Sequence, residues 1–326
     1  MDTLRWGVIA TGNIAGSMAE ALGYVDEAAL IAVGSRSQES ADVFGERWAV
    51  PRRYDSYSGV YADPDVDVVY IGTPHSAHHE NVLAALDEGK HVLCEKPLTL
   101  DTAQATECVA AAREKNLFLM EAMWMRFFPA ILRLQQILRE GIIGDVHLIE
   151  ASFCIDVPFD PDHRLFNPAL GGGALLDLGI YPLSFARLLL GEPATADSAV
   201  RIGITGVDET NAITLTFPGN EIAQLSSSTR AYRPQTAHVA GTKGLIELPD
   251  FYHPDQMTVY RPGQPAQVVD LPARGNGYVH EVEEVHRCLG EGLTESPAMS
   301  HDETLTMMRL MDSLRAEWGV EYPSGE

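Results

Sequence analysis

The stretch that decides the fold is Leu4-Arg-Trp-Gly-Val-Ile-Ala-Thr-Gly-Asn-Ile-Ala15. Its first seven residues are largely apolar and too few for a buried helix, so they predict a short strand over 4–10. A Thr-Gly-Asn turn follows, and a helical pattern of apolar residues then runs to residue 22. A strand, a tight turn and a helix in this order begin a βαβ unit.

The same alternation continues to about residue 120. Further strands are predicted over 28–34, 66–72, 90–94 and 117–120. The helices between them are predicted over 38–48, 77–87 and 101–115, the last with Asp101 as its cap. Strands that alternate with helices imply a doubly wound parallel sheet. We therefore expect an N-terminal α/β domain over residues 1–123.

The pattern changes after residue 123. Helices are expected over 127–139 and, in a Gly-rich segment, over 172–190. Runs rich in Thr, Val, Ile and Ser then follow without a useful helix between them, over 199–205, 211–217, 221–229, 236–240, 244–248 and 267–271. Two helices close the chain, at 278–289 and 301–318. Residues 124–326 should form an α+β domain with a large, mostly antiparallel, open sheet.

The composition of the chain limits which kinds of partner it can bind and indicates its cellular location. A chain of 326 residues suits two domains, and its formal charge of −23 disfavours nucleic acid. No run approaches the roughly twenty unbroken apolar residues of a membrane span, and the first residues lack a signal-peptide pattern. We expect a cytoplasmic protein with no membrane partner. The cysteines are far apart and should be reduced, buried thiols, at Cys94, Cys108, Cys154 and Cys288.

The first turn resembles a dinucleotide fingerprint. In G-x-G-x-x-G/A, Gly12 keeps the second glycine and Ala15 the last position, while Ala10 replaces the first glycine. A simple tight turn without function would also fit. Its place in the first βαβ unit favours a Rossmann site, in which backbone N–H groups at the helix start bind a pyrophosphate. The predicted contacts are Ala10, Thr11, Gly12, Asn13 and Ile14.

The end of the second strand indicates which nucleotide is bound. NAD-binding chains usually carry a carboxylate there, but this chain has Ser35-Arg36-Ser37. A guanidinium flanked by hydroxyls suits a ribose phosphate. We therefore expect NADP, with NAD possible. The alternative is an ordinary surface arginine at the start of a helix.

The next two strands should complete the cofactor cleft. Residues after the third strand would border the nicotinamide, namely Gly72, Thr73, Pro74, His75 and His78. His78 is expected to pack on the cofactor or to cap local backbone. The following strand ends in Glu95-Lys96-Pro97, at the edge where open parallel sheets bind ligands. The histidines lack a ligand spacing such as H-E-x-x-H, so no metal is expected.

A second segment carries candidate chemistry, from Gly171 to Pro182. On a helix, Asp177 and Tyr181 are four apart and share a face. A tyrosine next to a lysine ammonium can act as a general base toward an alcohol. Lys96 and Tyr181 are therefore the candidate catalytic pair, with Asp177 orienting Lys96 or a substrate hydroxyl. The alternatives are a core tyrosine and a solvated lysine.

Together these motifs resemble the Gfo/Idh/MocA family of NAD(P)-dependent oxidoreductases. The resemblance covers almost the whole chain and continues through residues 239–244, 281–285 and 295–297. Residues 121–129 and 176–181 are most similar to the branch of dimeric dihydrodiol dehydrogenases and NADP-xylose dehydrogenases. Many relatives carry histidine where this chain has Tyr181, but that branch is similar in using tyrosine.

The resemblance implies a Rossmann domain followed by a domain whose open sheet often serves for dimerisation. It implies Lys96 and Tyr181 as the catalytic pair, with Asp177 in support. We accordingly expect a homodimer or a higher homo-oligomer formed through the C-terminal sheet. Ala10 departs from the usual fingerprint, and relatives in this branch also vary there.

Aromatic residues should line the substrate side. Candidates are Trp124, Phe153 and His163, with Phe159, Arg164 and Phe166 nearby. Aromatic faces with a few polar groups suit a sugar or a cyclic diol. Trp124 could instead pack between domains, and Arg126 is expected to support cofactor or substrate.

The sequence therefore predicts an NADP-dependent dehydrogenase or reductase acting on a secondary CH–OH or C=O of a sugar, polyol or cyclic trans-diol. One alternative is a catalytically silent NADP-binding sensor or regulator. Another is an epimerase or lyase that keeps its nucleotide tightly bound.

Overall fold

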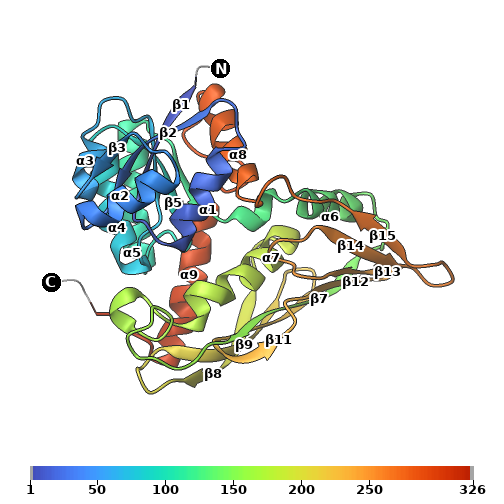
Figure 1. Ribbon diagram of the computed structural model, residues 1–326. Coiled ribbons are helices and arrows are strands. Elements are labelled where there is room, and N and C mark those ends of the chain that lie inside the picture. The colour runs from blue at the N-terminus through green and yellow to red at the C-terminus, as the bar shows by residue number, and fades with distance from the viewer. Residues whose placement is uncertain (1–2, 324–326) are drawn as a thin grey trace. The chain divides into compact units, whose positions relative to one another are not determined.

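The computed structural model describes residues 3–323 (Figure 1). The chain forms two compact units. The first runs up to Trp124 and also contains Arg274–Met308, while the second contains Met125–Ala273 and the chain from Arg309 onward. The first break lies next to the expected boundary at residue 123. Segment 274–308, which the sequence placed in the second domain, belongs instead to the first unit.

A parallel sheet forms the centre of the first unit. Within the described residues it has six strands in the order β3-β2-β1-β4-β5-β6, which is the Rossmann order. The strands are β1 Leu4–Ile9, β2 Ala28–Gly34, β3 Arg52–Tyr54, β4 Val68–Ile71, β5 His91–Glu95 and β6 Leu119–Ala122. All four residues of β4 are buried, as expected of a central strand covered on both faces. The predicted doubly wound sheet is confirmed.

Helices connect these strands, and their caps follow from the sequence. They are α1 Asn13–Leu22, α2 Gln38–Arg47, α3 Tyr57–Tyr61, α4 His78–Asp87 and α5 Thr102–Lys115, with a short 3-10 turn η1 His75–Ala77. The side chain of Asp101 accepts a hydrogen bond from the Gln104 backbone N–H, so the predicted cap of α5 is confirmed. The sequence missed β3 and α3, which span three and five residues, because such short elements show no clear periodicity.

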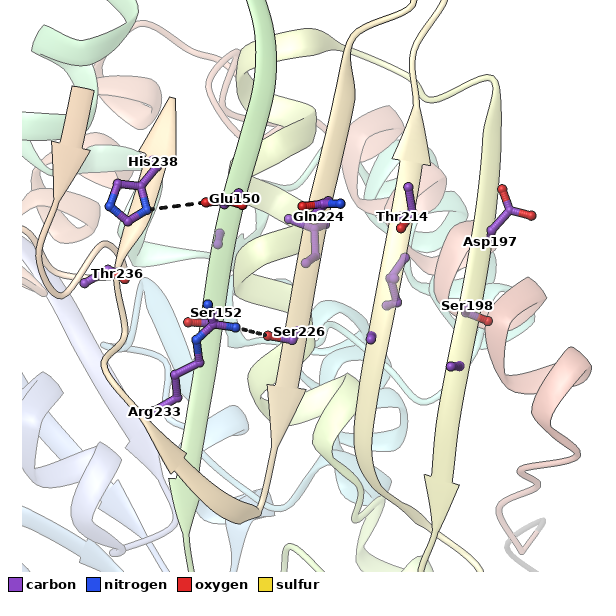
Figure 2. A pocket seen from close by; sticks show the side chains of 15 residues that line it. Glu150, Ser152, Asp197, Ser198, Thr214, Gln224, Ser226, Arg233, Thr236 and His238 are labelled. Carbon is purple, nitrogen blue, oxygen red and sulfur yellow. Dashed lines mark hydrogen bonds and ion pairs between the residues drawn. The ribbon is translucent and has the colours of Figure 1, made fainter. Parts of the chain in front are cut away.

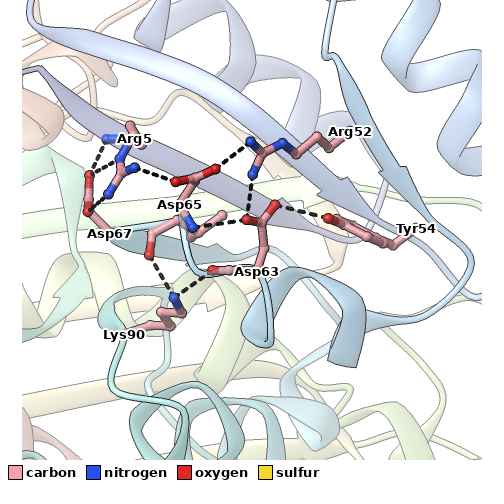
Figure 3. Close-up of polar contacts among 8 residues, drawn as sticks. Arg5, Arg52, Tyr54, Asp63, Asp65, Asp67 and Lys90 are labelled. Atoms are coloured by element: carbon pink, nitrogen blue, oxygen red, sulfur yellow. Dashed lines mark hydrogen bonds and ion pairs between the residues drawn. The ribbon is translucent and has the colours of Figure 1, made fainter.

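Charged side chains bind the amino ends of the strands to one another (Figure 3). Arg5 pairs with Asp65 and Asp67 at 2.9 and 2.8 Å. Asp63 is buried, and burial alone would raise its pKa, but hydrogen bonds from Arg52 and Tyr54 hold that pKa below its ordinary value. This cluster lies at the amino ends of the strands, opposite the carboxyl ends of β1, β4 and β5. It therefore stabilises the fold without occupying the carboxyl ends, where the ligand site is predicted.

Side chains of the returning segment explain its place in the first unit. It contains α8 Val279–Gly290 and the start of α9 His301–Trp318, and α8 packs against α1. The Trp6 indole donates to His286 Nε2 at 3.1 Å, and the two rings are stacked. Thr304 donates to Glu121 Oε2 at 2.8 Å. These buried polar contacts fix both helices to the Rossmann sheet.

The second unit is built on a large mixed sheet. Within residues 3–323 it has nine strands, in the order β15-β14-β13-β12-β7-β10-β9-β8, with β11 paired to β7. They are β7 Val146–Asp156, β8 Thr195–Ile202, β9 Asp208–Thr216, β10 Ile222–Ser228, β11 Arg230–Arg233, β12 Ala237–Gly241, β13 Gly244–Leu248, β14 Gln256–Tyr260 and β15 Gln267–Asp270. Strands β7 and β10 are parallel, and the other neighbours are antiparallel, so the mostly antiparallel sheet is confirmed.

Helices cover one face of this sheet. They include α6 Pro129–Arg139 and α7 Ile180–Leu190, which follows a π-helical turn, η4 Leu175–Gly179. Both η4 and α7 contact β7 and β10. Buried Ile149, Ala151 and Phe153 alternate along β7 with more polar residues, as expected of a sheet with one covered face.

The segment Pro168–Leu190 is long and apolar enough to cross a membrane by length and composition. Asp177 and Arg187 interrupt it, so the expectation that no unbroken apolar run of about twenty residues exists still holds. Inside the protein, however, 83% of its most apolar window is buried. A helix packed on a sheet in this way reaches the same hydropathy as a membrane span, so the finding is weak evidence for one.

Candidate active site

Ala10 keeps the backbone of the glycine it replaces. Its φ of +72° lies in the left-handed region, which costs an L-residue about 1–2 kcal/mol. The Ala10 N–H donates to the Gly34 carbonyl at 3.0 Å and ties the turn to the end of β2. The tight turn required by the fingerprint therefore forms despite the extra methyl group.

The start of α1 is open to an incoming group. Gly12 is the N-cap residue and has no side chain with which to cap the helix. A Cβ there would meet no described heavy atom within 4 Å. The Thr11 and Ser35 hydroxyls lie 3.3 Å apart, and a Cβ on Gly72 would lie 3.3 Å from Ile14. The predicted pyrophosphate turn, the end of β2 and the end of β4 thus converge, and the geometry fits a dinucleotide.

The residues expected to bind the ribose phosphate differ in exposure. Ser35 is 6% exposed and faces Thr11 in the turn. Arg36 and Ser37 are exposed, and the Ser37 hydroxyl accepts from the Ser40 N–H as the cap of α2. Arg36 is therefore the accessible cation, while Ser35 supports the turn.

His78 links the loops after β4 and β5, which the sequence predicted to border the nicotinamide. It is fully buried, and its Nδ1 and Nε2 lie 2.8 Å from the Pro97 carbonyl and 3.0 Å from the Thr73 carbonyl. Burial lowers the pKa of His78. Of its two expected roles, backbone capping is thus observed. The buried Thr73 hydroxyl has no hydrogen-bond partner among the described residues, which leaves a polar atom suited to a ligand.

Lys96 follows β5 directly, and its neighbours are fixed on both sides. The Tyr70 hydroxyl donates to Glu95 Oε1 at 2.6 Å. On the other side, the Leu98 N–H donates to Glu121 Oε1 at 3.1 Å. The carboxylate of Glu95, expected beside the cofactor, therefore has Tyr70 as a partner. The backbone that carries Lys96 is held at the carboxyl end of the sheet.

A glycine turn precedes the helix that carries the second half of the candidate site. Gly173 has φ of +125°, and a Cβ there would lie 2.4 Å from Asp208 Oδ1. The other oxygen, Oδ2, accepts from the Leu175 N–H at 2.8 Å and so caps the helix start. Burial raises the pKa of Asp208 to about 7.

The helix itself differs from the prediction of one α-helix over 172–190. Residues Leu175–Gly179 form a π-helical turn, and α7 begins at Ile180. Asp177 lies in this turn and Tyr181 is the second residue of α7. Because a π-helix has more residues per turn than an α-helix, residues four apart still lie near one face. Such turns are frequent at functional sites.

Aromatic rings enclose Tyr181. The side chain is 6% exposed, with ring centroids of Phe153 and Tyr252 at 5.3 and 5.7 Å. Phe153 and Tyr252 also stack on each other at 4.3 Å. Phe153 was predicted, but Tyr252 was missed, since it comes from a distant loop between β13 and β14. Burial raises the pKa of Tyr252.

Asp177 has a cationic partner in its own unit. Arg164 Nη1 and Nη2 donate to Asp177 Oδ1 and Oδ2 at 2.9 and 3.1 Å. The Asp177 side chain is 7% exposed and that of Arg164 is 54% exposed. The sequence expected Asp177 to orient Lys96 or a substrate hydroxyl, and it named Arg164 only as a neighbour. The spacing of thirteen residues gives no signal for this pair.

The remaining candidates have local partners. Trp124 is 8% exposed and stacks on Tyr278 at 4.1 Å, within the first unit. Arg126 is 5% exposed and donates to the Ser184 hydroxyl at 3.1 Å, within the second. His163 is exposed, and its Nδ1 accepts from the Leu165 N–H. Their predicted contacts with cofactor or substrate stay predictions.

Family models match both units. Residues 4–123 match the GFO/IDH/MocA oxidoreductase family with an NAD-binding Rossmann fold. Residues 131–247 match the GFO/IDH/MocA C-terminal domain. The chain belongs to the Gfo/Idh/MocA oxidoreductase family. The predicted family, the oxidoreductase class acting on CH–OH groups and the nicotinamide nucleotide are thereby confirmed.

Curated relatives match nearly the full length of this family member. Trans-1,2-dihydrobenzene-1,2-diol dehydrogenase of Xenopus laevis is 38% identical, covering 98% of this chain and 99% of that protein. The enzyme of the same name from Mus musculus is 36% identical, covering 98% of each chain.

Solved structures share the whole fold. KijD10, a 3-ketoreductase from Actinomadura kijaniata in complex with NADP and TDP-benzene, is 29% identical with a TM-score of 0.87, covering 97% of this chain and 98% of that one. The aldose-aldose oxidoreductase from Caulobacter crescentus, complexed with glycerol, is 25% identical with a TM-score of 0.89, covering 99% and 100%.

The structure groups the predicted residues within each unit. The fingerprint turn, Ser35 and Gly72 converge in the first unit, where His78 joins the loops after β4 and β5. Phe153, Asp177 and Tyr181 lie together in the second. Lys96 belongs to the first unit and Tyr181 to the second, so their meeting stays a prediction. Within residues 3–323, no group of three or more His, Cys, Asp or Glu side chains is arranged to hold a metal ion.

Proposed function

We propose that this protein is an NADP-dependent dehydrogenase or reductase of a secondary CH–OH or C=O in a sugar, polyol or cyclic trans-diol. The observation that carries the proposal is Tyr181, a buried phenol enclosed by two rings at the start of a helix that also presents Asp177. The names of the relatives support both substrate classes, since they act on a cyclic trans-diol or on aldoses.

Tyr181 acts as the general acid and base. A bound nicotinamide supplies hydride transfer, and the chain supplies the proton transfer. In oxidation, the Tyr181 phenolate takes the proton of the substrate hydroxyl, and in reduction the phenol returns it. A phenol titrates near pH ~10, so its use as a base at pH 7 costs about 4 kcal/mol. An ammonium about 4 Å away, at an effective dielectric of ~20, offers a similar stabilisation, which we assign to Lys96.

The aromatic residues set the substrate class. Phe153 and Tyr252 stack beside Tyr181 and present apolar surface to the C–H face of a ring. Asp177 supplies carboxylate oxygens for hydroxyl groups. We assign Trp124 and His163 as further substrate contacts.

The cofactor preference rests on the end of β2. Arg36 is exposed there, and residues 33–37 contain no carboxylate. A guanidinium at this position binds a ribose phosphate and gives a ribose hydroxyl no acceptor. The KijD10 structure, which contains NADP, supports the same preference.

A second copy of the chain is proposed to cover the open face of the large sheet. Figure 2 shows polar side chains along this face, with helices on the opposite side of the strands. They line a shallow cavity of about 470 Å³, where Glu150 and His238 are 3.9 Å apart. A homodimer or higher homo-oligomer would bury this face. The four buried, unbridged thiols of the described chain fit a cytoplasmic location.

The proposal is tested by mixing the purified protein with NADP⁺ and a panel of aldoses, inositols, anhydrosugars and diols. Growth of the reduced-nicotinamide absorbance with at least one panel member is expected. The Tyr181→Phe and Lys96→Met variants should bind NADP⁺ but lose turnover. Full turnover by either variant would contradict the assigned roles.

Two other outcomes would support the alternative functions. Tight NADP binding without turnover of any alcohol or carbonyl would indicate a silent sensor. Nucleotide that copurifies and shows no net reduction, while substrate is still converted, would indicate an epimerase or lyase.

A further inference from the structure

The Arg164–Asp177 ion pair is built into the glycine turn that begins the catalytic helix. The two side chains form two parallel hydrogen bonds, Nη1 to Oδ1 at 2.9 Å and Nη2 to Oδ2 at 3.1 Å. This fork-to-fork geometry is the strongest form of an ion pair, and it fixes the carboxylate plane. A lysine could not reproduce it.

The backbone next to Arg164 is held against the glycine turn by a hydrogen bond and by close packing. The Gly173 N–H donates to the Leu165 carbonyl at 2.9 Å. A Cβ on Gly172 would lie 2.9 Å from the Arg164 carbonyl oxygen, so a larger residue would displace the turn. The triple glycine therefore lets residues 164–165 pass directly beside the helix start and places the guanidinium over Asp177.

The ion pair reduces the negative charge that Asp177 would otherwise place near Tyr181. A lone carboxylate four residues before Tyr181 would oppose formation of the phenolate. Other ionisable groups of the second unit lie near by. Tyr252 packs on Tyr181, and His253 packs on Tyr252. Asp250 acts electrostatically on Tyr252. In this unit, Arg164 is the cation that contacts the carboxylate nearest in sequence to Tyr181.

We propose that Arg164 is a positioning residue of the reaction, which holds Asp177 in one orientation and cancels its charge beside Tyr181. The inference rests on the proposed function, because it assumes that Tyr181 transfers the proton. Asp177 can then accept hydrogen bonds without disfavouring the phenolate, and Lys96 has a smaller opposing field to overcome.

The test is the pH dependence of kcat/KM for alcohol oxidation by the full-length protein with NADP⁺. Oxidation requires the base form, so activity rises with pH through the pKa of the base. Arg164→Gln should move this rise to higher pH by about one unit, which is about a tenfold loss below the transition that is recovered above it. Arg164→Lys keeps the charge and should move the rise by much less.

A double variant separates charge from structure. In Arg164→Gln/Asp177→Asn the carboxylate charge is gone as well, so the rise should return toward its wild-type pH even if the maximal rate is lower. A loss that is equal at every pH, or a double variant with the same shift as Arg164→Gln, would overturn the inference. NADP⁺ affinity and thermal unfolding verify that each variant folds. If Arg164→Gln does not fold, Arg164→Met, which also removes the charge at this half-exposed position, takes its place in the comparison.

Failure of the inference is distinguishable from failure of the proposed function. If Tyr181→Phe is inactive and Arg164→Gln leaves the pH profile unchanged, Arg164 has no such role, while Tyr181 keeps its own. If Tyr181→Phe retains full turnover, the proposed function falls, and the inference falls with it.

Discussion

Asp208 Oδ1 lies so close to Gly173 that a Cβ at residue 173 would be 2.4 Å away. The glycine therefore leaves room for the carboxylate that caps the helical segment starting at Leu175. Its φ of +125° is also a conformation that L-residues rarely adopt. Glycine is required at residue 173 both by the close contact with Asp208 and by the backbone conformation of the turn.

Gly173→Ala should consequently lower the free energy of unfolding by about 2–4 kcal/mol, from backbone strain and overpacking together. Urea unfolding followed by circular dichroism measures the loss. Gly141→Ala is a matched control, because Gly141 has φ of +67° and a Cβ there meets no described atom within 4 Å. That variant should lose only about 1–2 kcal/mol, the cost of the left-handed backbone. Equal losses in both would contradict the contact with Asp208.

Asp208 should make stability depend on pH. Burial raises its pKa from 3.8 to about 7, so the folded chain keeps a proton that the unfolded chain releases over this range. Its contribution to the free energy of unfolding is complete below pH 3.8 and is lost as the pH rises toward 7. Three pH units at about 1.4 kcal/mol each give a loss of about 4 kcal/mol.

Asp208→Asn should remove this slope. Urea unfolding at one-unit steps from pH 4 to 8 should show wild-type stability falling relative to the variant as the pH rises. Asp26→Asn, at an exposed position in the turn before β2, removes an equal charge and should leave the slope in place. Parallel curves for wild type and Asp208→Asn would show that residue 208 is already ionised in the folded state at low pH.

Replacing Ala10 by glycine should stabilise the protein, in contrast to replacing Gly173 by alanine. Its φ of +72° is strained for alanine and relaxed for glycine, so Ala10→Gly should raise the free energy of unfolding by about 1 kcal/mol. Ala49, with φ of +56°, lies away from the fingerprint turn and serves as a control. Ala49→Gly should stabilise by a similar amount, and neither change should weaken NADP binding measured by nucleotide fluorescence. Destabilisation by Ala10→Gly would mean that the methyl group contributes packing that outweighs the strain.

Local patterns in the sequence predicted the Rossmann half well. Helix 13–22 and strand 28–34 match the structure because their apolar spacing and flanking turns are local signals. Strand β7 was missed although it is central to its sheet. Its polar residues Glu150 and Ser152 line the open face. The place of the strand depends on its pairing with distant strands.

The candidate site was predictable as motifs but not as contacts. Lys96 and Tyr181 are marked by their neighbours in sequence. Arg164 joins Asp177 across the glycine turn, and Tyr252 reaches Tyr181 from a loop some seventy residues later. Contacts between residues so far apart in sequence depend on the tertiary fold and leave no local pattern. The π-helical turn at Leu175–Gly179 has no sequence signature that distinguishes it from a continuous α-helix.

Arg36 should decide between the two nicotinamide nucleotides. It is the exposed cation at the end of β2, where NADP carries a phosphate and NAD a hydroxyl. Arg36→Glu should reduce kcat/KM for NADP⁺ by about ten- to a hundredfold, because it removes a charge-assisted hydrogen bond worth roughly 1.5–3 kcal/mol and adds a repulsive charge. The activity with NAD⁺ should rise or stay constant, since a carboxylate can accept from the ribose hydroxyl. Arg47→Glu makes the same charge change at an exposed position at the far end of α2, so it should leave the NADP⁺ to NAD⁺ ratio unaltered. Initial rates with both nucleotides at varied concentration measure the ratio, and an equal effect of the two variants would assign the preference to the overall field of the protein rather than to Arg36.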